Sequence, residues 1–440
     1  MSRRVARRLP SGKRAAAVEE EELDSGASSD GEGPGAEDSV PEVPETADGR
    51  RVRMAKELLA GMDAAVQSSS HADDTIADQL EEDALRASGK WQSQLARSLL
   101  GCVVEADNVR MLRGPRKSAT CVALAPDESA SYCGSKDGSI TRWDLASGTR
   151  TVLTGNPAGQ SKRDVLAVAC SPDGRLLASA GRQQSVLIWD CRTLSVVTEL
   201  PAHRDAVTSL AVSRGGTDQS SDLYSASADR CIKVWSMARR AYIETLFGHQ
   251  EGITALDTLQ QETVLSAGSD RTLRLWKVAD ESQLVYRGHT APIDCVAQLN
   301  ADAFVSGSQD GSLALWSTMR KKPLAMVDAA HGEAAWGGAC WMSALTTLPF
   351  SDVAISGACD GALRFWHCSE AARSVQQVMS VPLAGFVNGL AVAPSGRFLV
   401  AAVGQEHRLG RWFSVREAKN GCAVVALPEA LHRRPALGAS

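Results

Sequence analysis

The sequence is poor in aromatic residues other than tryptophan, and it contains no paired-cysteine motif. Its 440 residues include only four Tyr and seven Phe beside ten Trp. The eleven Cys form no C-x-x-C pair and no Cys/His cluster with the spacing of a zinc site. Most of them, such as Cys121, Cys170 and Cys295, stand singly within apolar runs. This pattern favours reduced core thiols in an intracellular protein over disulfide bonds or a metal site.

Several other signals are missing from the sequence. No apolar run approaches the ~18 residues needed to span a bilayer, and the N-terminus lacks the apolar core of a signal peptide. Phosphate-loop, dinucleotide-binding and metal-binding motifs are absent. We therefore expect a soluble protein with no cofactor, no metal ion, no membrane association and no small-molecule substrate.

The net charge of −5 conceals two oppositely charged segments at the start of the chain. Residues 1–14 contain six Arg or Lys and no acid, whereas residues 15–48 contain twelve Asp or Glu and no base. The rest is close to neutral, so its overall charge does not indicate nucleic-acid binding. Residues 15–48 are also rich in Gly, Pro and Ser and too poor in bulky apolar residues to form a core. The sequence thus predicts a disordered, basic-then-acidic tail over residues 1–48.

Helical periodicity follows over residues 49–101, where apolar residues recur at spacings that place them on one face of a helix. They form two stripes: Val52, Leu59, Met62 and Val66 in the first, and Ile76, Leu80, Trp91, Leu95 and Leu99 in the second. Asp73 and Asp74 can cap the second helix. The pattern predicts a short α-helical arm, which either packs on the domain that follows or contacts a partner.

From Val109 the pattern changes to alternation and to a repeat of about forty residues. Each unit contains three or four short β-type runs separated by Gly, Asp, Ser and Pro. One Trp marks each unit, and the spacing between successive Trp is 40 to 50 residues: Trp143, Trp189, Trp235, Trp276, Trp316, Trp366 and Trp412. Four-stranded units of this length are typical of WD40 β-propeller blades. The sequence therefore predicts an all-β, seven-bladed WD40 propeller over residues 109–428 and a C-terminal tail over residues 429–440.

Four units contain a loop His, a Ser, an Asp and a Trp at matching positions, and in two of them the His follows a Gly. We expect each set to be a structural tetrad in which buried polar groups satisfy one another. The sets are His203/Ser225/Asp229/Trp235, His249/Ser266/Asp270/Trp276, His289/Ser306/Asp310/Trp316 and His331/Ser356/Asp360/Trp366. Recurrence at a fixed period with Trp, and the absence of a G-x-S-x-G turn, argue against a catalytic triad. No catalytic residue is predicted, and the protein is not expected to be an enzyme.

The other three units lack parts of the tetrad. Blade one has Pro115 where His belongs and Cys133 in place of Ser, and blade two has Gln183 at the Asp position. Blade seven has Phe386, Ala402 and Glu406 at the His, Ser and Asp positions, with Trp412 taken as its Trp.

Closure of the ring requires an outer strand for blade seven, and two segments are candidates. Residues 109–114 precede blade one, and residues 423–428 follow Trp412. We expect the N-terminal segment to close the ring, leaving the C-terminal segment to pack on the outside.

Residues that break the repeat are the candidate binding residues, and the basic ones among them fall into several clusters. Arginine and lysine contact nucleic-acid phosphates. Two clusters follow the third strand of a blade, on the face opposite the Gly-His loops, whereas the blade-one cluster lies on the Gly-His side. The candidates are Arg239 and Arg240; Arg320, Lys321 and Lys322; Arg113, Arg116 and Lys117; and, from blade seven, Gln405, His407, Arg408, Arg411 and Arg416.

Several of these motifs carry a resemblance to a known family. YIETLFGHQ (242–250), ESQLVYRGH (281–289) and above all VGQEHRLGRW (403–412) resemble the WD-repeat subunit of the U3 small nucleolar ribonucleoprotein. The helical lead-in beginning RMAKELL (53–59) is similar to that family as well. The resemblance covers roughly residues 50–425.

The resemblance implies a nucleolar, non-catalytic protein that binds U3 small nucleolar RNA. In that family the propeller recognises the box B/C region of the RNA together with the kink-turn-binding box C/D core protein. The particle, with other proteins of the small-subunit processome, guides early cleavages of the ribosomal RNA precursor. Recognition of this kind combines phosphate contacts with the shape of a folded RNA–protein surface.

Two other functions remain open. Residues 189–192, Trp-Asp-Cys-Arg, resemble the WDxR box of substrate receptors in cullin-type ubiquitin ligases. A generic chromatin or signalling propeller that binds a peptide across its channel is the third option, and only the predicted fold supports it.

Overall fold

The computed structural model describes residues 92–100, 102, 104, 108–153, 164–201, 203–213, 221–259, 262–334 and 337–432. These residues belong to one compact unit, Asp73–Ser440. The predicted tail over residues 1–48 and most of the predicted helical arm lie outside the described residues. Within them, no helix is long and apolar enough to cross a membrane.

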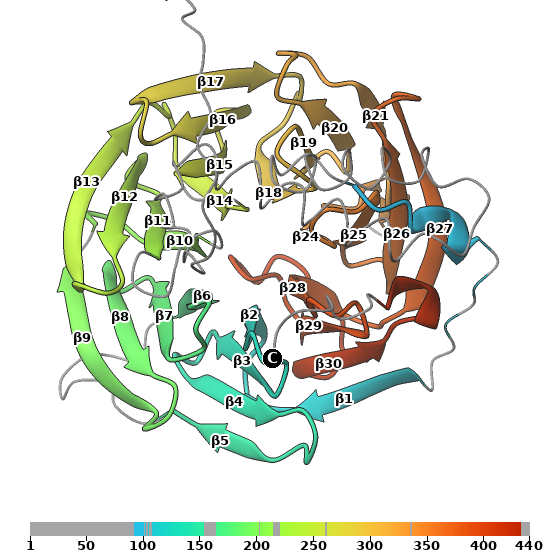
Figure 1. The fold of residues 1–440 in the computed structure, drawn as a ribbon. Coiled ribbons are helices and arrows are strands. Elements are labelled where there is room, and N and C mark those ends of the chain that lie inside the picture. Colours follow the sequence, from blue (N-terminus) through green and yellow to red (C-terminus); the bar gives the residue numbers. More distant parts are fainter. Residues whose placement is uncertain are drawn as a thin grey trace, which may run out of the picture. The chain divides into compact units, whose positions relative to one another are not determined.

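The described residues form seven four-stranded antiparallel sheets arranged as a ring (Figure 1), which confirms the predicted seven-bladed propeller. Blades one to three comprise β2 (Ala119–Leu124), β3 (Ala130–Ser135), β4 (Ile140–Asp144) and β5 (Arg150–Val152); β6 (Val165–Cys170), β7 (Leu176–Gly181), β8 (Ser185–Asp190) and β9 (Ser195–Pro201); and β10 (Val207–Val212), β11 (Asp222–Ser227), β12 (Cys231–Ser236) and β13 (Ala241–Phe247).

Blades four to six follow the same order, from an inner first strand to an outer fourth strand. They comprise β14 (Ile253–Asp257), β15 (Thr263–Gly268), β16 (Thr272–Lys277) and β17 (Ser282–Arg287); β18 (Ile293–Gln298), β19 (Ala303–Ser308), β20 (Leu313–Ser317) and β21 (Ala325–Val327); and β24 (Ala344–Thr347), β25 (Val353–Gly357), β26 (Ala362–Ser369) and β27 (Ser374–Pro382). A small hairpin, β22 (Glu333–Ala334) and β23 (Gly338–Ala339), precedes blade six.

Blade seven joins both ends of the propeller. Its strand order is β28 (Phe386–Val392), β29 (Phe398–Gly404), β30 (Gly421–Ala426) and β1 (Val109–Arg113). The N-terminal strand is therefore the outermost one, as predicted, with Val109 opposite Val425 and Arg113 opposite Gly421. The expectation that the C-terminal segment packs outside the ring is wrong, because that segment is the third strand of the blade.

The assignment of Trp412 to the third strand of blade seven is also wrong. In the other blades the tetrad Trp pairs with the residue two positions before the Ser, as Trp276 pairs with Val264. The corresponding pair in blade seven is Val424 with Val400. Trp412 lies instead in the loop between β29 and β30, residues 405–420, and is 67% exposed. We call this segment the blade-seven loop.

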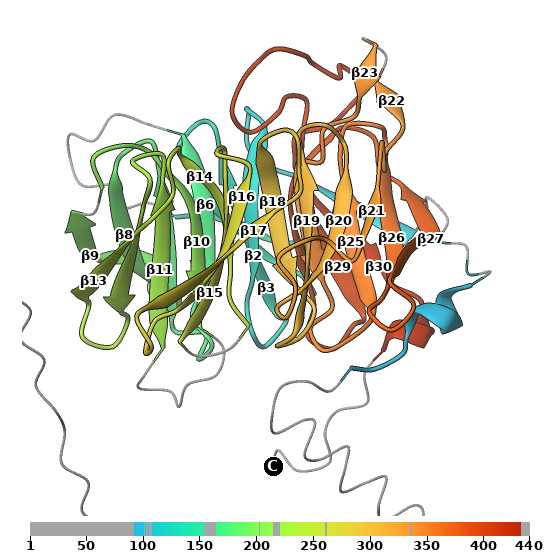
Figure 2. The same cartoon turned by 90° about the horizontal axis from the view of Figure 1, so that it is seen from above.

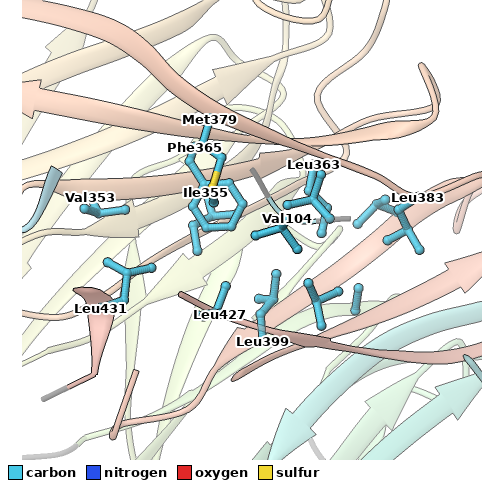
Figure 3. Packing of buried hydrophobic residues seen from close by; sticks show 14 of the residues in the cluster. Val104, Val353, Ile355, Leu363, Phe365, Met379, Leu383, Leu399, Leu427 and Leu431 are labelled. Atoms are coloured by element: carbon cyan, nitrogen blue, oxygen red, sulfur yellow. The ribbon is translucent and has the colours of Figure 1, made fainter. Parts of the chain in front are cut away.

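The core lies between successive sheets, and the largest apolar cluster joins blades six and seven (Figure 3). Phe365, Leu399 and Val425 are fully buried in it. Burial of such side chains stabilises the fold by about 1.5–3 kcal/mol each. Leu431, from the short 3-10 turn η3 (Glu429–Leu431), is buried in the same cluster. The residues that follow β30 therefore pack on the propeller as far as Leu431.

The described end of the predicted helical arm is not an α-helix. Ser93 forms a parallel bridge with Ser351, and a single 3-10 turn, η1 (Ala96–Leu99), follows. The N–H groups of Leu95 and Ala96 donate to Asp352 Oδ1 over 2.8 and 3.0 Å. This carboxylate satisfies donors at the start of the turn that a longer helix would otherwise leave free. These described residues pack on the propeller, and the choice between the two alternatives for the rest of the arm stays a prediction.

The antiparallel order divides the loops between two faces of the ring. One face, which we call the upper face, carries the connections between blades and the loops between second and third strands. The lower face carries the remaining loops within each blade. Hairpin β22–β23 and the blade-seven loop project from the upper face (Figure 2). The inner strands surround a central cavity of about 440 Å³ near the lower face.

Candidate nucleic-acid interface on the upper face

Three of the four predicted tetrads form with the expected geometry, in blades three, four and six. In each, the His Nδ1 lies 2.9–3.0 Å from the Asp carboxylate and Nε2 lies 2.7–2.8 Å from the Ser hydroxyl. The Trp indole N–H donates to the same hydroxyl over 2.7–2.9 Å. The three sets are His203/Ser225/Asp229/Trp235, His249/Ser266/Asp270/Trp276 and His331/Ser356/Asp360/Trp366.

The serine at the centre of each tetrad is inaccessible to a ligand. The four serines, all with an exposed fraction of 0%, are Ser225, Ser266, Ser306 and Ser356. Ser266 is held between the His249 ring and the Trp276 indole, and Ser356 is held in the same way by its own His and Trp. Ser266 and Ser356 are therefore structural residues, as predicted for the tetrads, and they do not belong to a binding surface.

Blade five departs from this geometry by one inserted hydroxyl. His289 Nδ1 lies 2.9 Å from Ser312 Oγ, and Ser312 in turn donates to Asp310. The indole of Trp316 still donates to Ser306 over 2.8 Å. Burial lowers the pKa of His289, and the more distant Asp310 opposes this only in part. The imidazole is therefore neutral near pH 7.

The incomplete tetrads of blades one and two differ in whether the Trp indole N–H has a hydrogen-bond acceptor. In blade two, Trp189 donates to Ser179 over 2.7 Å without a His. In blade one, the buried Trp143 indole N–H has no hydrogen-bond partner among the described residues. The substitution of Cys133 for Ser, with Pro115 in place of His, removes its acceptor.

The basic clusters occupy opposite faces. Arg239 and Arg240 lie in the turn between β12 and β13, and Arg320, Lys321 and Lys322 lie between β20 and β21. All five are exposed on the lower face, opposite the Gly-His loops, as expected. They belong to two different blades, and their role in binding stays a prediction. Arg192 of the WDxR-like run is exposed on the same face, whereas Trp189 of that run is buried.

On the upper face, the blade-seven loop brings residues of three blades together. The side chain of Asn420 donates to Arg116 O over 3.1 Å, which ties the loop to blade one. Arg182 of blade two reaches Leu409 O at 3.5 Å. The exposed basic residues gathered here are Arg113, Arg116, Lys117, Arg182, Arg411, Arg416 and Lys419, which we call the upper basic patch. Sequence analysis missed Arg182 and Lys419, because no repeat position marks them.

The predicted residues Gln405, His407 and Arg408 face inward and hold the loop in place. Gln405 donates through its side-chain amide to Ala418 O over 3.0 Å. The Arg408 guanidinium crosses the channel and donates to two inner-strand carbonyls, Thr254 O at 3.3 Å and Asp294 O at 3.2 Å. These residues therefore differ from Arg411 and Arg416, which are exposed.

Arg408 is joined by a second anchor, Asn388 on the inner strand of blade seven. The Asn388 side chain accepts from Arg408 N over 2.8 Å and donates to Ala119 O and to Glu406 O. The Arg408 guanidinium also lies close to the Asp294 side chain: burial raises the pKa of Asp294, and the positive charge of Arg408 lowers it in part. The backbone at the base of the loop is thus fixed to blades one, four, five and seven.

His407 is enclosed by aromatic rings and has no charge near neutral pH. Its ring centroid lies 6.0 Å from Trp341, 6.3 Å from Phe386 and 5.9 Å from Trp412. Burial, with smaller contributions from Arg408 and Lys136, lowers the pKa of His407 to about 3. A buried neutral imidazole is a packing group, so His407 is not a phosphate ligand in this arrangement.

Lys136 of blade one forms the remaining clamp on the loop. Its ammonium group donates to Gly410 O over 2.8 Å and forms an ion pair with Glu406 at 3.2 Å, and its side chain is only 6% exposed. Glu406 also pairs with Arg411 at 3.3 Å. Glu406 was predicted at the tetrad Asp position and instead links the loop to blade one.

Comparison with known proteins supports both the fold and the family. The family model described as "WD domain, G-beta repeat" matches residues 106–144, 150–190, 194–236, 240–277 and 280–317. A protein named "U3 small nucleolar RNA-interacting protein 2" of Homo sapiens is 39% identical, with 87% of this chain and 82% of that protein covered. "U3 snoRNP-associated protein-like EMB2271" of Arabidopsis thaliana is 36% identical, with 86% and 85% covered.

Comparison with a solved structure also supports the fold and the family. "Structure of U3-55K" aligns with a TM-score of 0.70 at 42% identity, covering 74% of this chain and all of that one. The similarity to the two relatives extends well beyond the five repeats that the family model matches. It covers more than four fifths of this chain and more than four fifths of each relative. The chain belongs to the family of WD-repeat proteins associated with the U3 small nucleolar ribonucleoprotein.

Proposed function

We propose that this protein is a non-catalytic RNA- and protein-binding component of the U3 box C/D small nucleolar ribonucleoprotein. Its ligand would be the box B/C region of U3 RNA together with the kink-turn-binding core protein. Through that particle, and with other processome proteins, it would act in early processing of the ribosomal RNA precursor for the small subunit, in the nucleolus. The proposal is supported by the names of the relatives and by the upper basic patch.

One observation carries the choice of surface. The blade-seven loop, which belongs to the least regular blade, assembles basic residues of blades one, two and seven at one place. Phosphate contacts from such residues position a folded RNA on a protein. The lower-face clusters are separate pairs and triplets on individual blades, so they offer a smaller surface for one RNA.

The test reverses charge on the patch and leaves the loop anchors Lys136, Asn388 and Arg408 unaltered. In Arg411→Glu/Arg416→Glu, both altered side chains are exposed, whereas Arg408 is excluded because it holds the loop. Two lost phosphate contacts should flatten the dependence of log affinity on log salt by about 1.4 and weaken binding at least ~10-fold. The measurements are recovery of U3 RNA with the tagged protein from cells and salt titration of the purified complex.

The matched control is Arg239→Glu/Arg240→Glu, which makes the same charge change on the lower face. It should recover U3 RNA as the unaltered protein does. If Arg239→Glu/Arg240→Glu lost U3 RNA and Arg411→Glu/Arg416→Glu retained it, the RNA would bind the lower face instead. Failure of the unaltered protein to recover U3 RNA would refute the proposed function itself.

A further inference from the structure

Trp412 is the most exposed aromatic side chain of the blade-seven loop, next to Arg411 of the upper basic patch. The residue is 67% exposed, although Trp is among the residues that usually bury most of their surface. It lies beside Arg411, whose side chain is 68% exposed. A large apolar ring that remains in water, next to a cationic group, is a candidate contact surface.

The ring is supported on one side and at one edge. A Cβ atom added to Gly410 would lie 2.7–2.8 Å from three carbons of the six-membered ring, so the Gly410 backbone packs directly against one side of the indole. Trp341 supports an edge, with centroids 5.8 Å apart and planes at 68°. His407 lies 5.9 Å away at 35°. Since one side is covered and most of the ring is exposed, the other side faces solvent.

The residues that support Trp412 are themselves fixed. Lys136 donates to Gly410 O from its buried position, and Arg408 anchors the preceding backbone in the channel. A ligand that stacks on the ring would therefore not have to order the loop first. Preorganisation of this kind reduces the entropic cost of binding.

The surroundings favour a nucleobase over an apolar protein surface. Phe413 is the other exposed large apolar residue of the loop, and it is only 40% exposed. The neighbouring exposed residues include Arg411 and Arg416, with Arg182 at the adjacent Leu409 carbonyl. An exposed aromatic ring with cations close by matches the way proteins bind unpaired nucleotides, with bases on the ring and phosphates on the cations.

We infer that Trp412 is a stacking platform for one unpaired base of the bound RNA, with Arg411 contacting the adjacent phosphate. This inference rests on the proposed function and adds to it: the protein holds a single-stranded nucleotide beside the folded RNA. A base with both faces in a helical stack cannot use this platform. The RNA must therefore present a flipped-out or unpaired residue next to the upper face.

The test compares three substitutions of Trp412 in the full chain, isolated from cells with its particle. Trp412→Tyr keeps an aromatic face, Trp412→Leu keeps apolar area without one, and Trp412→Ala removes both. Stacking predicts near-normal U3 RNA affinity for Tyr and a loss of about 10- to 100-fold for both Leu and Ala. Ultraviolet crosslinking with peptide mapping should also place an RNA adduct on residue 412, and Leu and Ala should abolish it.

The control is Phe247→Ala, which removes a ring of similar exposure, 69%, from the outer strand of blade three. It should leave RNA recovery unchanged, and thermal unfolding should show that all variants are folded. Equal RNA affinity and an unchanged crosslink in Trp412→Ala would overturn the inference. The inference would also be overturned if Trp412→Ala lost a partner protein that Trp412→Leu retained. Trp412 would then be an apolar protein contact.

The outcomes also separate this inference from the proposed function. If the unaltered protein recovers U3 RNA and Arg411→Glu/Arg416→Glu does not, the proposed function stands whatever Trp412→Ala does. If the unaltered protein recovers no U3 RNA, the proposed function fails, and the platform fails with it.

Discussion

In each complete tetrad, one serine hydroxyl is hydrogen-bonded to both the His ring and the Trp indole. Ser225 lies 2.8 Å from His203 Nε2 and accepts the Trp235 indole N–H at 2.9 Å, while His203 is oriented by Asp229. All these groups except the Asp are buried. Loss of any one would leave a buried partner unsatisfied, at a cost of about 1–3 kcal/mol. The repeat could be predicted from the sequence because these four residue types satisfy one another at a fixed spacing.

The tetrad carboxylates predict a loss of stability in acid. Burial alone would raise the pKa of Asp229, but hydrogen bonds from His203 and from the N–H groups of Arg204 and Cys231 lower it from 3.8 to about 2. A depressed folded-state pKa gives stability that is present above about pH 4 and is lost as the pH falls towards 2. After allowance for solvent screening, we expect about 1 kcal/mol from this residue.

Denaturant unfolding between pH 5 and pH 2.5 measures this contribution. Asp229→Asn should be less stable than the unaltered protein at pH 5, and the difference should shrink as the pH falls. Asp280→Asn, at a largely exposed position, should show the unaltered pH dependence. A difference between Asp229→Asn and the unaltered protein that stays constant over this range would contradict the assignment.

At the scale of elements, the blade-seven loop explains both the success and the failure of sequence analysis. The motif at 403–412 indicated an irregular segment with candidate binding residues, and the structure places it on the upper face. The sequence did not reveal which residues face inward, because the contacts of Arg408 are to residues 154 and 114 positions away. Counting Trp residues also misassigned Trp412, since Val424 occupies the equivalent strand position without a recognisable signature.

The loop geometry predicts that Arg408 is a positioning residue. Arg408→Ala removes its hydrogen bonds to Thr254 O and Asp294 O, and hydrogen bonds to charged groups contribute about 1.5–3 kcal/mol. Amide hydrogen exchange in residues 405–420 should become at least ~10-fold faster, while β28 and β29 remain protected.

Arg411→Ala provides the comparison, because it removes an equally long cation from the same loop without touching the channel. Its loop amides should exchange close to the unaltered rate, even though RNA affinity falls. Equal acceleration in both variants would mean that the channel contacts do not hold the loop.

At the scale of the whole propeller, stability depends on β1, which precedes blade one in the chain but is the outer strand of blade seven. Five residues of β1 pair along β30, and Leu112 of β1 is buried with Trp143 and Cys422. Without β1, β30 would present an unpaired edge and the ring would have one three-stranded blade. The outer edge of blade seven would then pass from β1 to β30, and the apolar side chains that Leu112 covers would be exposed.

Two shortened chains separate closure from the packing of the arm. A chain beginning at Asn108 keeps β1 but loses η1, whereas a chain beginning at Gly114 loses both. We expect the second to unfold at a midpoint about 10 °C or more below the first, since loss of a paired strand amounts to several kcal/mol, and to scatter light on heating. If the two chains unfold at the same temperature, β1 does not close the ring. If adding the peptide 108–114 raises the midpoint of the shorter chain, the missing stability lies in strand pairing, because that peptide restores only the contacts of β1.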